Sequence, residues 1–324
     1  MSTSTMRAVV QHAFGGPEVL RVEQVPRPVP LPTEVLVRVH AAGINPVDWK
    51  TRAGTGMARV LGEPPFTVGW DVSGVVAEVG FGVTTLAVGD EVYGMPWFPR
   101  AAGAYAEYVT APARQFARKP AGIGHEQAAA VPLAALTAWQ TLVDTAHVGS
   151  GDRVLVHAAA GGVGHFAVQI AKHFGAYVIG TASAPRHEWL AGLGADELID
   201  YTATRFEHAV KDVDIVIDLV GDGHDNTSTR SLDVLRPGGL VVAIPGGASP
   251  ELQQAAQARG LRSSSFLVEP DGPALARIAG LIEAGQLAAE VQEAFPLEQA
   301  AQAHALGEAG RTRGKLVLQI ASSA

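Results

Sequence analysis

The chain has 324 residues, of which 47 % are hydrophobic and 17 % are charged, and its formal net charge is −8. This length predicts about two domains, and the composition is typical of a globular protein with a buried core. The acidic balance, with no block of Lys or Arg, disfavours nucleic acid as a partner, because a phosphate backbone binds to a basic surface. The absence of cysteine excludes disulfides, thiolate catalysis and Cys-ligated zinc.

The sequence also argues against a membrane partner. No uninterrupted apolar run reaches the roughly 18 residues that a membrane-spanning helix needs. The polar residues 1–5 lead directly into a strand-like segment, residues 6–11, without the apolar core of a signal peptide. We therefore expect no membrane association and a cytoplasmic location.

The first third of the chain predicts a compact, barrel-like β domain. Val35, Val37 and Val39 recur with the period of two that is typical of a strand. Pro and Gly are frequent in this region, which favours short strands joined by turns. Further strands are expected at residues 72–79, 91–93 and 105–109.

From His125 onward the pattern changes to alternating strands and helices. The helical spacing of apolar residues over 163–174 predicts a helix after the first strand, and another helix is expected around residues 186–193. Strands separated by such helices predict a parallel sheet with helices on both faces. We expect six strands, at residues 153–157, 177–181, 197–200, 214–218, 240–244 and 263–268.

The remaining segments complete an α/β fold with two domains. Residues 272–284 and 297–308 predict helices, and residues 315–320 predict a strand that packs against the first domain. We expect the β-rich domain at 1–124 with 270–324, and the doubly wound domain at 125–269. The last strand of the parallel sheet would be an edge with apolar residues, which favours pairing of two chains as a homodimer.

The strongest local motif is the segment from Ala158 to Gly164, in which a strand runs through small residues into a helix. The spacing of Ala159, Gly161 and Gly164 is that of a dinucleotide-binding fingerprint with alanine at the first position. Gly161 would let the backbone approach a pyrophosphate, and Gly164 would let the helix pack on the strand. Glycine turns also join strands to helices in other proteins, but the position of this turn after the first of six strands favours a cofactor site.

The segment after the second strand favours NADPH over NADH. An NAD site usually has an acidic residue about 20 residues past the glycines, where it binds the ribose 2′-hydroxyl. Here the segment reads Thr181-Ala182-Ser183-Ala184, and the first acid, Glu188, falls in the next helix. Ser183 and Arg186 would bind a 2′-phosphate by hydrogen bonding and charge pairing. The alternative for Arg186 is a solvated residue at the start of a helix.

These motifs resemble the zinc-independent quinone-oxidoreductase branch (zeta-crystallin-like) of the medium-chain dehydrogenase/reductase superfamily. The resemblance implies a GroES-like substrate domain, a Rossmann domain and an NADP(H) cofactor. The matching segments are spread over nearly the whole chain: GINPVDWK at 43–50, VGWDVSG at 68–74, LAALTA at 133–138, AAAGGVG at 158–164, LRPGG at 235–239 and RGKLVL at 313–318.

Carried over by position, the resemblance also implies which residues contact the cofactor. Thr137 would lie near the nicotinamide, and Tyr201 with Arg186 would flank the adenosine phosphate. The full set of expected cofactor contacts is Thr137, Ala159, Gly161, Gly162, Val163, Ser183, Arg186, Tyr201, Val220, Ile244, Gly246, Phe266, Val268 and Lys315.

The chain departs from the alcohol-dehydrogenase branch in its lack of zinc ligands. That branch has a catalytic Cys/His pair and a structural lobe with four cysteines, whereas this chain has no cysteine. The segment Gly69-Trp70-Asp71 stands where that branch usually has Gly-His-Glu, and none of the 11 histidines has a recognisable ligand spacing. We therefore expect no metal site.

The expected reaction is NADPH-dependent reduction of a quinone or an α,β-unsaturated carbonyl compound by direct hydride transfer. Without zinc, alcohol oxidation is disfavoured, because nothing makes the hydroxyl more acidic. The oxygen of a small apolar carbonyl substrate takes up the developing charge more easily. Asn45 and Asp48 are the catalytic candidates, Asn45 as a contact to the substrate or the nicotinamide ribose and Asp48 as a residue that orients its neighbours. The alternatives are a turn at Asn45-Pro46 and a helix N-cap at Asp48.

Several alternatives stay open on the sequence alone. The related reductases of enoyl thioesters and of other specialised enones are not discriminated, and neither is a chain that binds NADPH without catalysis. The proton donor is unassigned, because residues 53–57 lack the tyrosine that many relatives have there. The segment Met95-Pro96-Trp97-Phe98 would form either an apolar substrate wall or part of the core.

Overall fold

The computed structural model describes residues 4–321. Within this range the chain forms two compact units. The first unit consists of the residues up to Leu136 together with those from Glu269 onward, and the second unit is Thr137–Val268.

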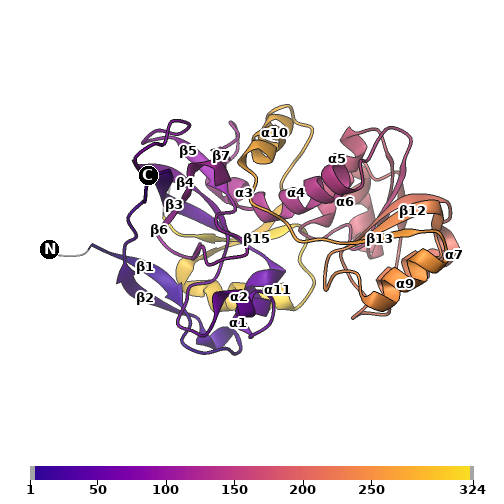
Figure 1. Cartoon of the computed structure of the whole chain (residues 1–324), viewed down its shortest axis with the longest axis horizontal. Coiled ribbons are helices and arrows are strands. Elements are labelled where there is room, and N and C mark those ends of the chain that lie inside the picture. Colours follow the sequence, from indigo (N-terminus) through magenta and orange to yellow (C-terminus); the bar gives the residue numbers. More distant parts are fainter. Residues whose placement is uncertain (1–3, 322–324) are drawn as a thin grey trace. The chain divides into compact units, whose positions relative to one another are not determined.

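The first unit contains a seven-stranded sheet and a separate antiparallel pair, β1 (Thr5–Val10) with β2 (Arg21–Pro26). All neighbours in the larger sheet are antiparallel except β14 and β15, which are parallel. Figure 1 labels most of its strands. Their order is β14 (Val291–Pro296), β15 (Lys315–Gln319), β3 (Glu34–Ile44), β4 (Asp71–Val79), β5 (Glu91–Gly94) and β7 (Phe116–Arg118), and β6 (Tyr108–Pro112) also pairs with β3.

The predicted alternation on β3 places its valines in the core. Val35, Val37 and Val39 are fully buried, whereas Arg38 between them is exposed. They pack with Val72 and Val76 of β4 and with Leu316 and Leu318 of β15. The helices of this unit are α1 (Pro46–Arg52), α2 (Ala58–Leu61), α3 (His125–Ala129), α10 (Gly272–Glu283) and α11 (Ala300–Glu308).

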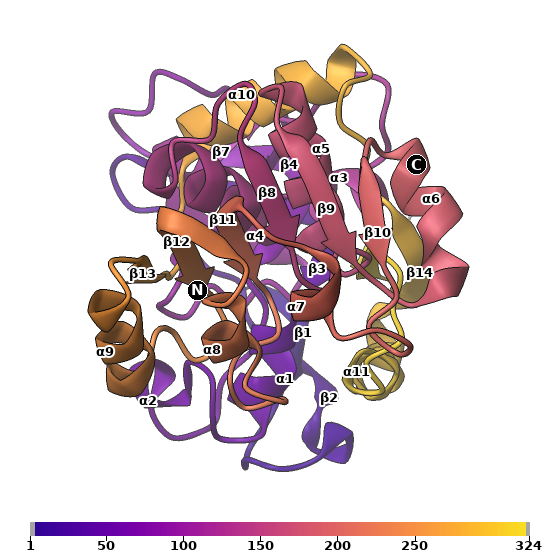
Figure 2. The same ribbon diagram turned by 90° about the vertical axis from the view of Figure 1, so that its right-hand side faces the viewer.

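The second unit is a six-stranded sheet in which every pair is parallel. Counted along the chain, the spatial order is 3-2-1-4-5-6, the doubly wound order of dinucleotide-binding folds, as predicted. Figure 2 shows the central strands side by side. The order is β10 (Glu197–Ile199), β9 (Tyr177–Thr181), β8 (Arg153–Val156), β11 (Val213–Asp218), β12 (Leu235–Ala243) and β13 (Arg262–Ser265).

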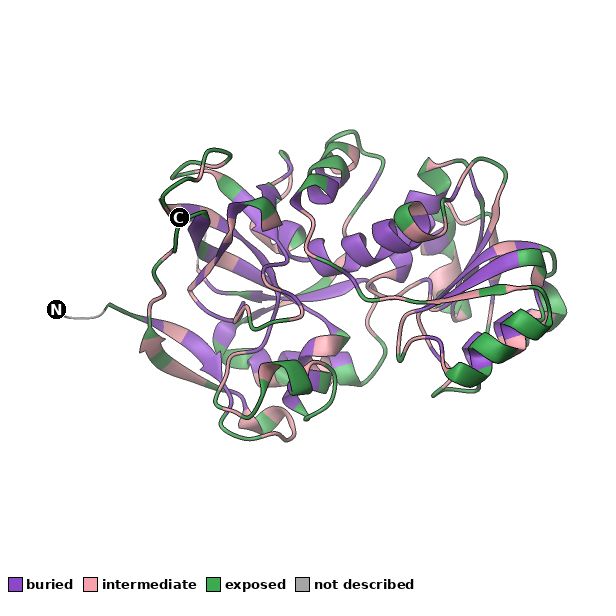
Figure 3. Ribbon diagram, in the orientation of Figure 1, coloured by how far each residue is buried: buried purple, intermediate pink, exposed green. Residues whose placement is uncertain are grey.

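The helices of the second unit alternate with its strands. The α5 helix has the predicted apolar face, and its residues from Gly164 to Ala171 are all buried, which Figure 3 shows in purple. None of the helices within residues 4–321 is long and apolar enough to cross a bilayer. The helices are α5 (Gly164–His173), α6 (His187–Gly192), α7 (Phe206–Ala209), α8 (Thr227–Ser231) and α9 (Pro250–Ala258), and α4 (Pro132–Trp139) precedes them.

The boundary between the units lies later than expected, because residues 125–136 belong to the first unit. Gly43 on β3 approaches α3 so closely that a Cβ there would lie 2.3 Å from the carbonyl oxygen of Ala129. The backbone N–H of Leu133 donates to Asp71 Oδ1 on β4 at 2.7 Å. These contacts fasten the segment to the antiparallel sheet, and sequence periodicity cannot show them.

Three predicted strands have clearly different bounds in the structure. The strand expected at 240–244 is β12, which begins earlier, at Leu235. The strand expected at 105–109 is β6, which begins at Tyr108, because the backbone of Tyr105 bonds instead to Val9 and Val68. The strand expected at 263–268 is β13, which ends at Ser265. Its place at the edge of the sheet agrees with the prediction, but the apolar residues 266–268 lie beyond the strand.

Candidate active site

The turn after β8 is built for close backbone packing. Ala158 has a positive φ of 49°, and the N–H of Gly161 donates to its carbonyl at 2.9 Å. At Gly164, the first residue of α5, a Cβ would lie 2.3 Å from the Ala158 carbonyl oxygen and 2.7 Å from Ala159 Cα. Only glycine therefore allows α5 to start this close to the turn.

The same turn leaves its backbone open on one side, as a phosphate cradle requires. A Cβ at Gly161 would meet only one atom within 4 Å, the Ala158 carbonyl oxygen at 3.2 Å. Gly161, Gly162 and Val163 are half-buried and directly precede α5. The first N–H groups of a helix have no intrahelical partner and attract anions. The residues present thus fit a pyrophosphate.

His157 connects this turn to two other elements. Its Nε2 lies 2.9 Å from Ser231 Oγ on α8, and its Nδ1 lies 3.3 Å from Thr181 Oγ1 at the end of β9. Ser231 donates its own proton to the Thr227 carbonyl (2.7 Å), so it accepts from His157 and the ring proton is on Nε2. Thr181 Oγ1 accepts the N–H of Ala158 at 3.2 Å. Burial lowers the pKa of His157 to about 4, which keeps the ring neutral.

The structure brings most of the expected cofactor residues to one edge of the parallel sheet. Each follows the carboxyl end of a strand, which is where ligands bind in doubly wound folds. Tyr201 is 62 % exposed, whereas Val268 is buried. In chain order, these residues are Ala159 to Val163 after β8, Ser183 and Arg186 after β9, Tyr201 after β10, Val220 after β11, Ile244 and Gly246 after β12, and Phe266 and Val268 after β13.

Two expected cofactor residues lie elsewhere. Thr137 is on α4 and is 3 % exposed. Lys315 is on β15 in the first unit, where it is also 3 % exposed and its ammonium group faces oxygens of that unit. For both, the contact with the cofactor stays a prediction.

A carboxylate that the sequence argument did not consider lies close to the segment after β9. Asp200 directly follows β10 and accepts hydrogen bonds from the N–H (2.9 Å) and hydroxyl (2.7 Å) of Thr202. These bonds, with a further one from the backbone of Ala184, lower its pKa. The sequence did not indicate this proximity, because the strand order of the sheet, not the sequence spacing, brings Asp200 beside residues 183–186.

In the first unit, Asn45 is held rigidly at the start of α1. It is the N-cap residue of α1, and Pro46 follows it at the first helical position. Its Nδ2 donates to Asp71 Oδ2 at 2.8 Å, and its Oδ1 accepts from the ammonium of Lys315. Lys315 also donates to the Ile44 carbonyl at 2.8 Å and lies 3.7 Å from Asp71 Oδ2. The Asp71–Lys315 ion pair therefore fixes the orientation of the Asn45 amide.

Asp48 is a fully buried carboxyl group at the third position of α1, not at its N-cap. Its Oδ2 accepts the N–H of Asn45 at 2.7 Å and the hydroxyl of Tyr105 at 2.8 Å. Its Oδ1 has no hydrogen-bond partner among the described residues. Burial raises the pKa of Asp48 to about 7, against the hydrogen bonds from Asn45 and Tyr105.

Residues far apart in sequence complete this cluster, and the sequence did not reveal them. Tyr105 Oη lies 3.1 Å from His304 Nε2 on α11, and His304 Nδ1 lies 3.2 Å from Arg52 Nη1. Arg52 in turn donates to Glu308 at 2.6 Å and to the Gly15 carbonyl at 3.1 Å. No local motif marks Tyr105 or His304, because only the tertiary structure brings them to Asp48.

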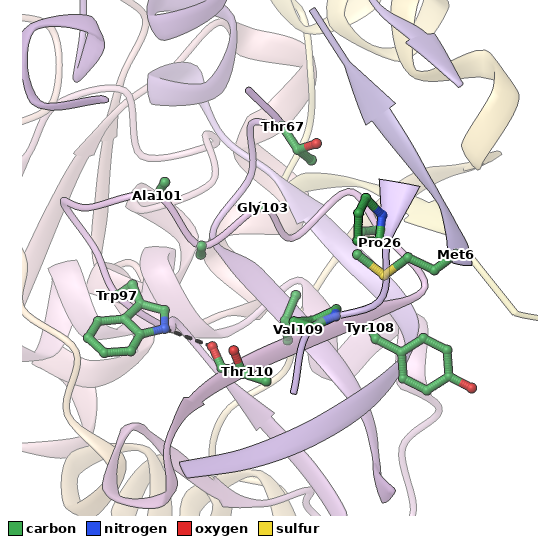
Figure 4. Close-up of a pocket in the computed structure, with 12 residues that line it drawn as sticks. Met6, Pro26, Thr67, Trp97, Ala101, Gly103, Tyr108, Val109 and Thr110 are labelled. Carbon is green, nitrogen blue, oxygen red and sulfur yellow. Dashed lines mark hydrogen bonds between the residues drawn. The ribbon is translucent and has the colours of Figure 1, made fainter. Parts of the chain in front are cut away.

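Residues 95–98 were expected to form either an apolar substrate wall or part of the core, and the structure divides them: some are core residues and one lines a cavity. Met95 is fully buried and Phe98 is 6 % exposed, so both are core residues. Trp97 lines a cavity of about 230 Å³ on the first unit, and its indole N–H donates to the Thr110 carbonyl at 2.7 Å (Figure 4). Gly103 and Tyr108 lie on the same cavity.

Comparisons with known proteins agree with this geometry. The model of the alcohol dehydrogenase GroES-like domain matches residues 31–121, and that of the zinc-binding dehydrogenases matches residues 193–318. A quinone oxidoreductase structure from Coxiella burnetii has a TM-score of 0.93 and 38 % identity, over 98 % of this chain and 100 % of that one. The NADPH-dependent alkenal/one oxidoreductase of Arabidopsis thaliana chloroplasts is 36 % identical, over 97 % of this chain and 79 % of that protein.

The chain belongs to the quinone-oxidoreductase branch of the medium-chain dehydrogenase/reductase superfamily. The quinone oxidoreductase of Escherichia coli, solved with NADPH, has a TM-score of 0.86 and 30 % identity, over 97 % of this chain and 100 % of that one. The resemblance, the α/β fold with a GroES-like and a Rossmann unit, and the NADP(H) cofactor are thereby confirmed.

Trp70 and Asp71, which the resemblance places where the alcohol dehydrogenases have zinc ligands, are both engaged within the first unit. Within residues 4–321 no three His, Cys, Asp or Glu side chains are grouped to hold a metal ion. Trp70 donates its indole N–H to the Arg100 carbonyl at 2.6 Å. Both oxygens of Asp71 are engaged, by Leu133 on one side and by Asn45 on the other.

Proposed function

We propose that this protein reduces quinones or α,β-unsaturated carbonyl compounds with NADPH, by direct hydride transfer and without zinc. The observation that supports this most directly is the Ala158–Gly164 turn, whose open backbone and helix N-terminus suit a dinucleotide in a chain related throughout to such reductases. The absence of cysteine and the engagement of Asp71 in an ion pair support the zinc-independent route.

The residues at the carboxyl edge of the parallel sheet would hold the cofactor. The turn N–H groups of Gly162 and Val163 would bind the pyrophosphate, Gly161 would let the backbone approach it, and Ser183 and Arg186 would bind the adenosine 2′-phosphate. When bound, NADPH supplies the hydride. The protein would bind and orient the reactants, since hydride transfer needs the two carbons in close alignment.

On the substrate side, Asn45 would contact the reactants. Its amide is already oriented by Lys315 and Asp71, so no reorganisation is needed when charge develops on the substrate. Preorganised donors of this kind stabilise an oxyanion more effectively than water does.

The test is turnover of a panel of 1,4-quinones, enones and enoyl thioesters with NADPH and NADH side by side. We expect NADPH oxidation with quinones or enones, and a lower rate with NADH. Tight NADPH binding without turnover on any of these substrates would instead indicate a binding protein. A fast reaction with enoyl thioesters alone would move the assignment to that substrate class.

We also propose that the chain forms a homodimer in the cytoplasm. The strand at the edge of the parallel sheet, β13, pairs on one side only within the described residues. Leu267, just past this strand, is 53 % exposed. An unpaired edge with apolar neighbours favours association with a second copy.

A further inference from the structure

Two loops of the second unit flank the point at which its strand order reverses, between β8 and β11. Doubly wound sheets bind their ligands at this switch point, outside the carboxyl ends of the strands. We propose that α8 holds both loops in place, and that Asp218 is the positioning residue of the loop that meets the nicotinamide half of NADPH. This inference rests on the proposed function, because it concerns the cofactor of the same reaction.

Asp218 is the last residue of β11, and its side chain is fully buried. Its Oδ1 accepts the N–H of Val220 at 2.8 Å and the N–H of Gly221 at 3.1 Å. Its Oδ2 accepts from the same N–H of Gly221 at 3.2 Å and from the hydroxyl of Ser228 on α8. The carboxyl group of Asp218 thus joins the loop after β11 to α8.

The far side of this loop packs against the loop after β12. Gly221 has a positive φ of 82°, and a Cβ there would lie 2.7 Å from the carbonyl oxygen of Pro245. The N–H groups of Val220 and Gly221 are engaged by Asp218, so they do not bind a phosphate. What the loop presents is the half-buried, apolar side chain of Val220. Its position depends on Asp218 on one side and on Pro245 on the other.

The same helix, α8, is also bonded to the loop after β8. Ser231 accepts from Nε2 of His157, the first residue after β8, at 2.9 Å. Ser231 and Ser228 are both buried, and they lie three residues apart on α8. Residues three apart are neighbours on one face of a helix. One short helix therefore holds the phosphate turn through His157 and the loop after β11 through Asp218.

The strand order decides which half of the cofactor each loop would meet. The residues expected at the adenosine 2′-phosphate follow β9 and β10, which lie on one side of β8, and the phosphate turn follows β8 itself. A dinucleotide with its pyrophosphate on this turn must extend its nicotinamide half to the other side, over β11. Adenosine 2′,5′-bisphosphate ends at the 5′-phosphate, so it would contact the turn but would not reach Val220.

The first test compares the binding of NADPH and of adenosine 2′,5′-bisphosphate to the wild type and to Asp218→Asn, by calorimetric titration. The substitution replaces one acceptor oxygen with an amide NH₂ group, which cannot accept from the loop. We expect the Kd for NADPH to rise about 10-fold, and the Kd for the bisphosphate to change less than about twofold.

Asp214→Asn is the matched control, because it makes the same change on the same strand. Asp214 lies near the amino end of β11, where its Oδ2 accepts the N–H of Arg153 at 2.8 Å. Asp214→Asn removes an acceptor from a backbone N–H at the edge of the sheet opposite to the loops. It should leave the Kd of both ligands at the wild-type value.

Two serine variants test α8 itself. Ser228→Ala keeps the backbone hydrogen bonds of Asp218 and removes only the bond from α8, so it decides the test should Asp218→Asn fail to fold. We expect about a threefold rise in the Kd for NADPH alone. Ser231→Ala leaves the Nε2 proton of His157 without its acceptor and acts on the phosphate turn, so the Kd of both ligands should rise together.

The outcomes separate this inference from the proposed function. Equal losses of affinity for NADPH and the bisphosphate in Asp218→Asn or Ser228→Ala overturn the inference, because they indicate a general loosening of the second unit. Wild-type affinity for NADPH in these variants overturns it as well, and both results leave the proposed function intact. A wild type that does not bind NADPH overturns the proposed function.

Discussion

Burial shifts the pKa values of His157 and Asp48 toward the uncharged form, although one is a base and the other an acid. Burial lowers the pKa of His157 to about 4 and raises that of Asp48 to about 7. Each holds a backbone group at the start of a loop that is expected to meet a ligand. His157 acts on Ala158 through Thr181, and Asp48 accepts the N–H of Asn45 directly.

Replacing His157 by alanine should weaken NADPH binding as well as stability. The buried hydroxyl of Ser231 loses its donor and Thr181 loses its acceptor, which costs about 1–3 kcal/mol in the free energy of unfolding. Ala158 is then less well held, so we expect a several-fold higher Kd for NADPH by fluorescence titration. His208→Ala removes an exposed histidine of the same unit and serves as the control. An unchanged Kd would show that His157 does not position the turn.

The stability of Asp48→Asn relative to the wild type should depend on pH. The pKa of Asp48 is raised in the folded state from 3.8 to about 7, so its favourable contribution is present below about pH 4 and lost as the pH rises through 7. Asparagine does not titrate. The advantage of the variant should therefore grow over this range, by up to about 4 kcal/mol, and then level off. Denaturant unfolding at a series of pH values measures it, and a constant difference would contradict the raised pKa.

Arg186→Glu should change the choice of cofactor. A carboxylate repels a 2′-phosphate and accepts a hydrogen bond from a 2′-hydroxyl, so the KM for NADPH should rise about 10-fold or more while that for NADH does not. Arg59→Glu makes the same charge change at an exposed position of the first unit. Equal effects of the two variants would indicate a general electrostatic influence and not a contact at Arg186.

At the scale of elements, the β8–turn–α5 unit depends on a single missing side chain. Gly164→Ala would press a Cβ against the backbone oxygen of Ala158, which cannot move without disturbing the turn. We expect a loss of NADPH affinity of at least about 10-fold and a lower thermal midpoint. Gly192→Ala, in α6, meets no atom within 4 Å and should instead stabilise the protein by about 0.5–1 kcal/mol. Similar behaviour of the two variants would contradict the packing argument.

Sequence periodicity predicted most elements of both units, because burial alternates with a regular period along them. The six parallel strands and their doubly wound order are confirmed. The bounds of β6, β12 and β13 were wrong, since pairing with other strands decides them. In the candidate site, the motif around Asn45 and Asp48 was visible in the sequence. Tyr105 and His304 were not, because they come from other elements and have no characteristic spacing.

At the scale of the whole molecule, the edge strand predicts a test of self-association. If β13 and its apolar neighbours form the contact, Leu267→Lys should convert a dimer into a monomer in light scattering, because a charge would be buried at the contact. Val60→Lys alters a side chain of similar exposure, 52 % against 53 %, in the first unit and should leave the mass unchanged. A wild-type monomer would exclude the proposed homodimer.

The position of β15 between β14 and β3 has a consequence for how the protein is made. The first unit needs a strand that is synthesised after the entire second unit, whereas Thr137–Val268 is continuous in sequence. During translation the second unit can therefore fold while the sheet of the first unit still lacks β15. Lys315 belongs to that late strand, so the Asn45 amide acquires its final orientation only after the second unit has been synthesised.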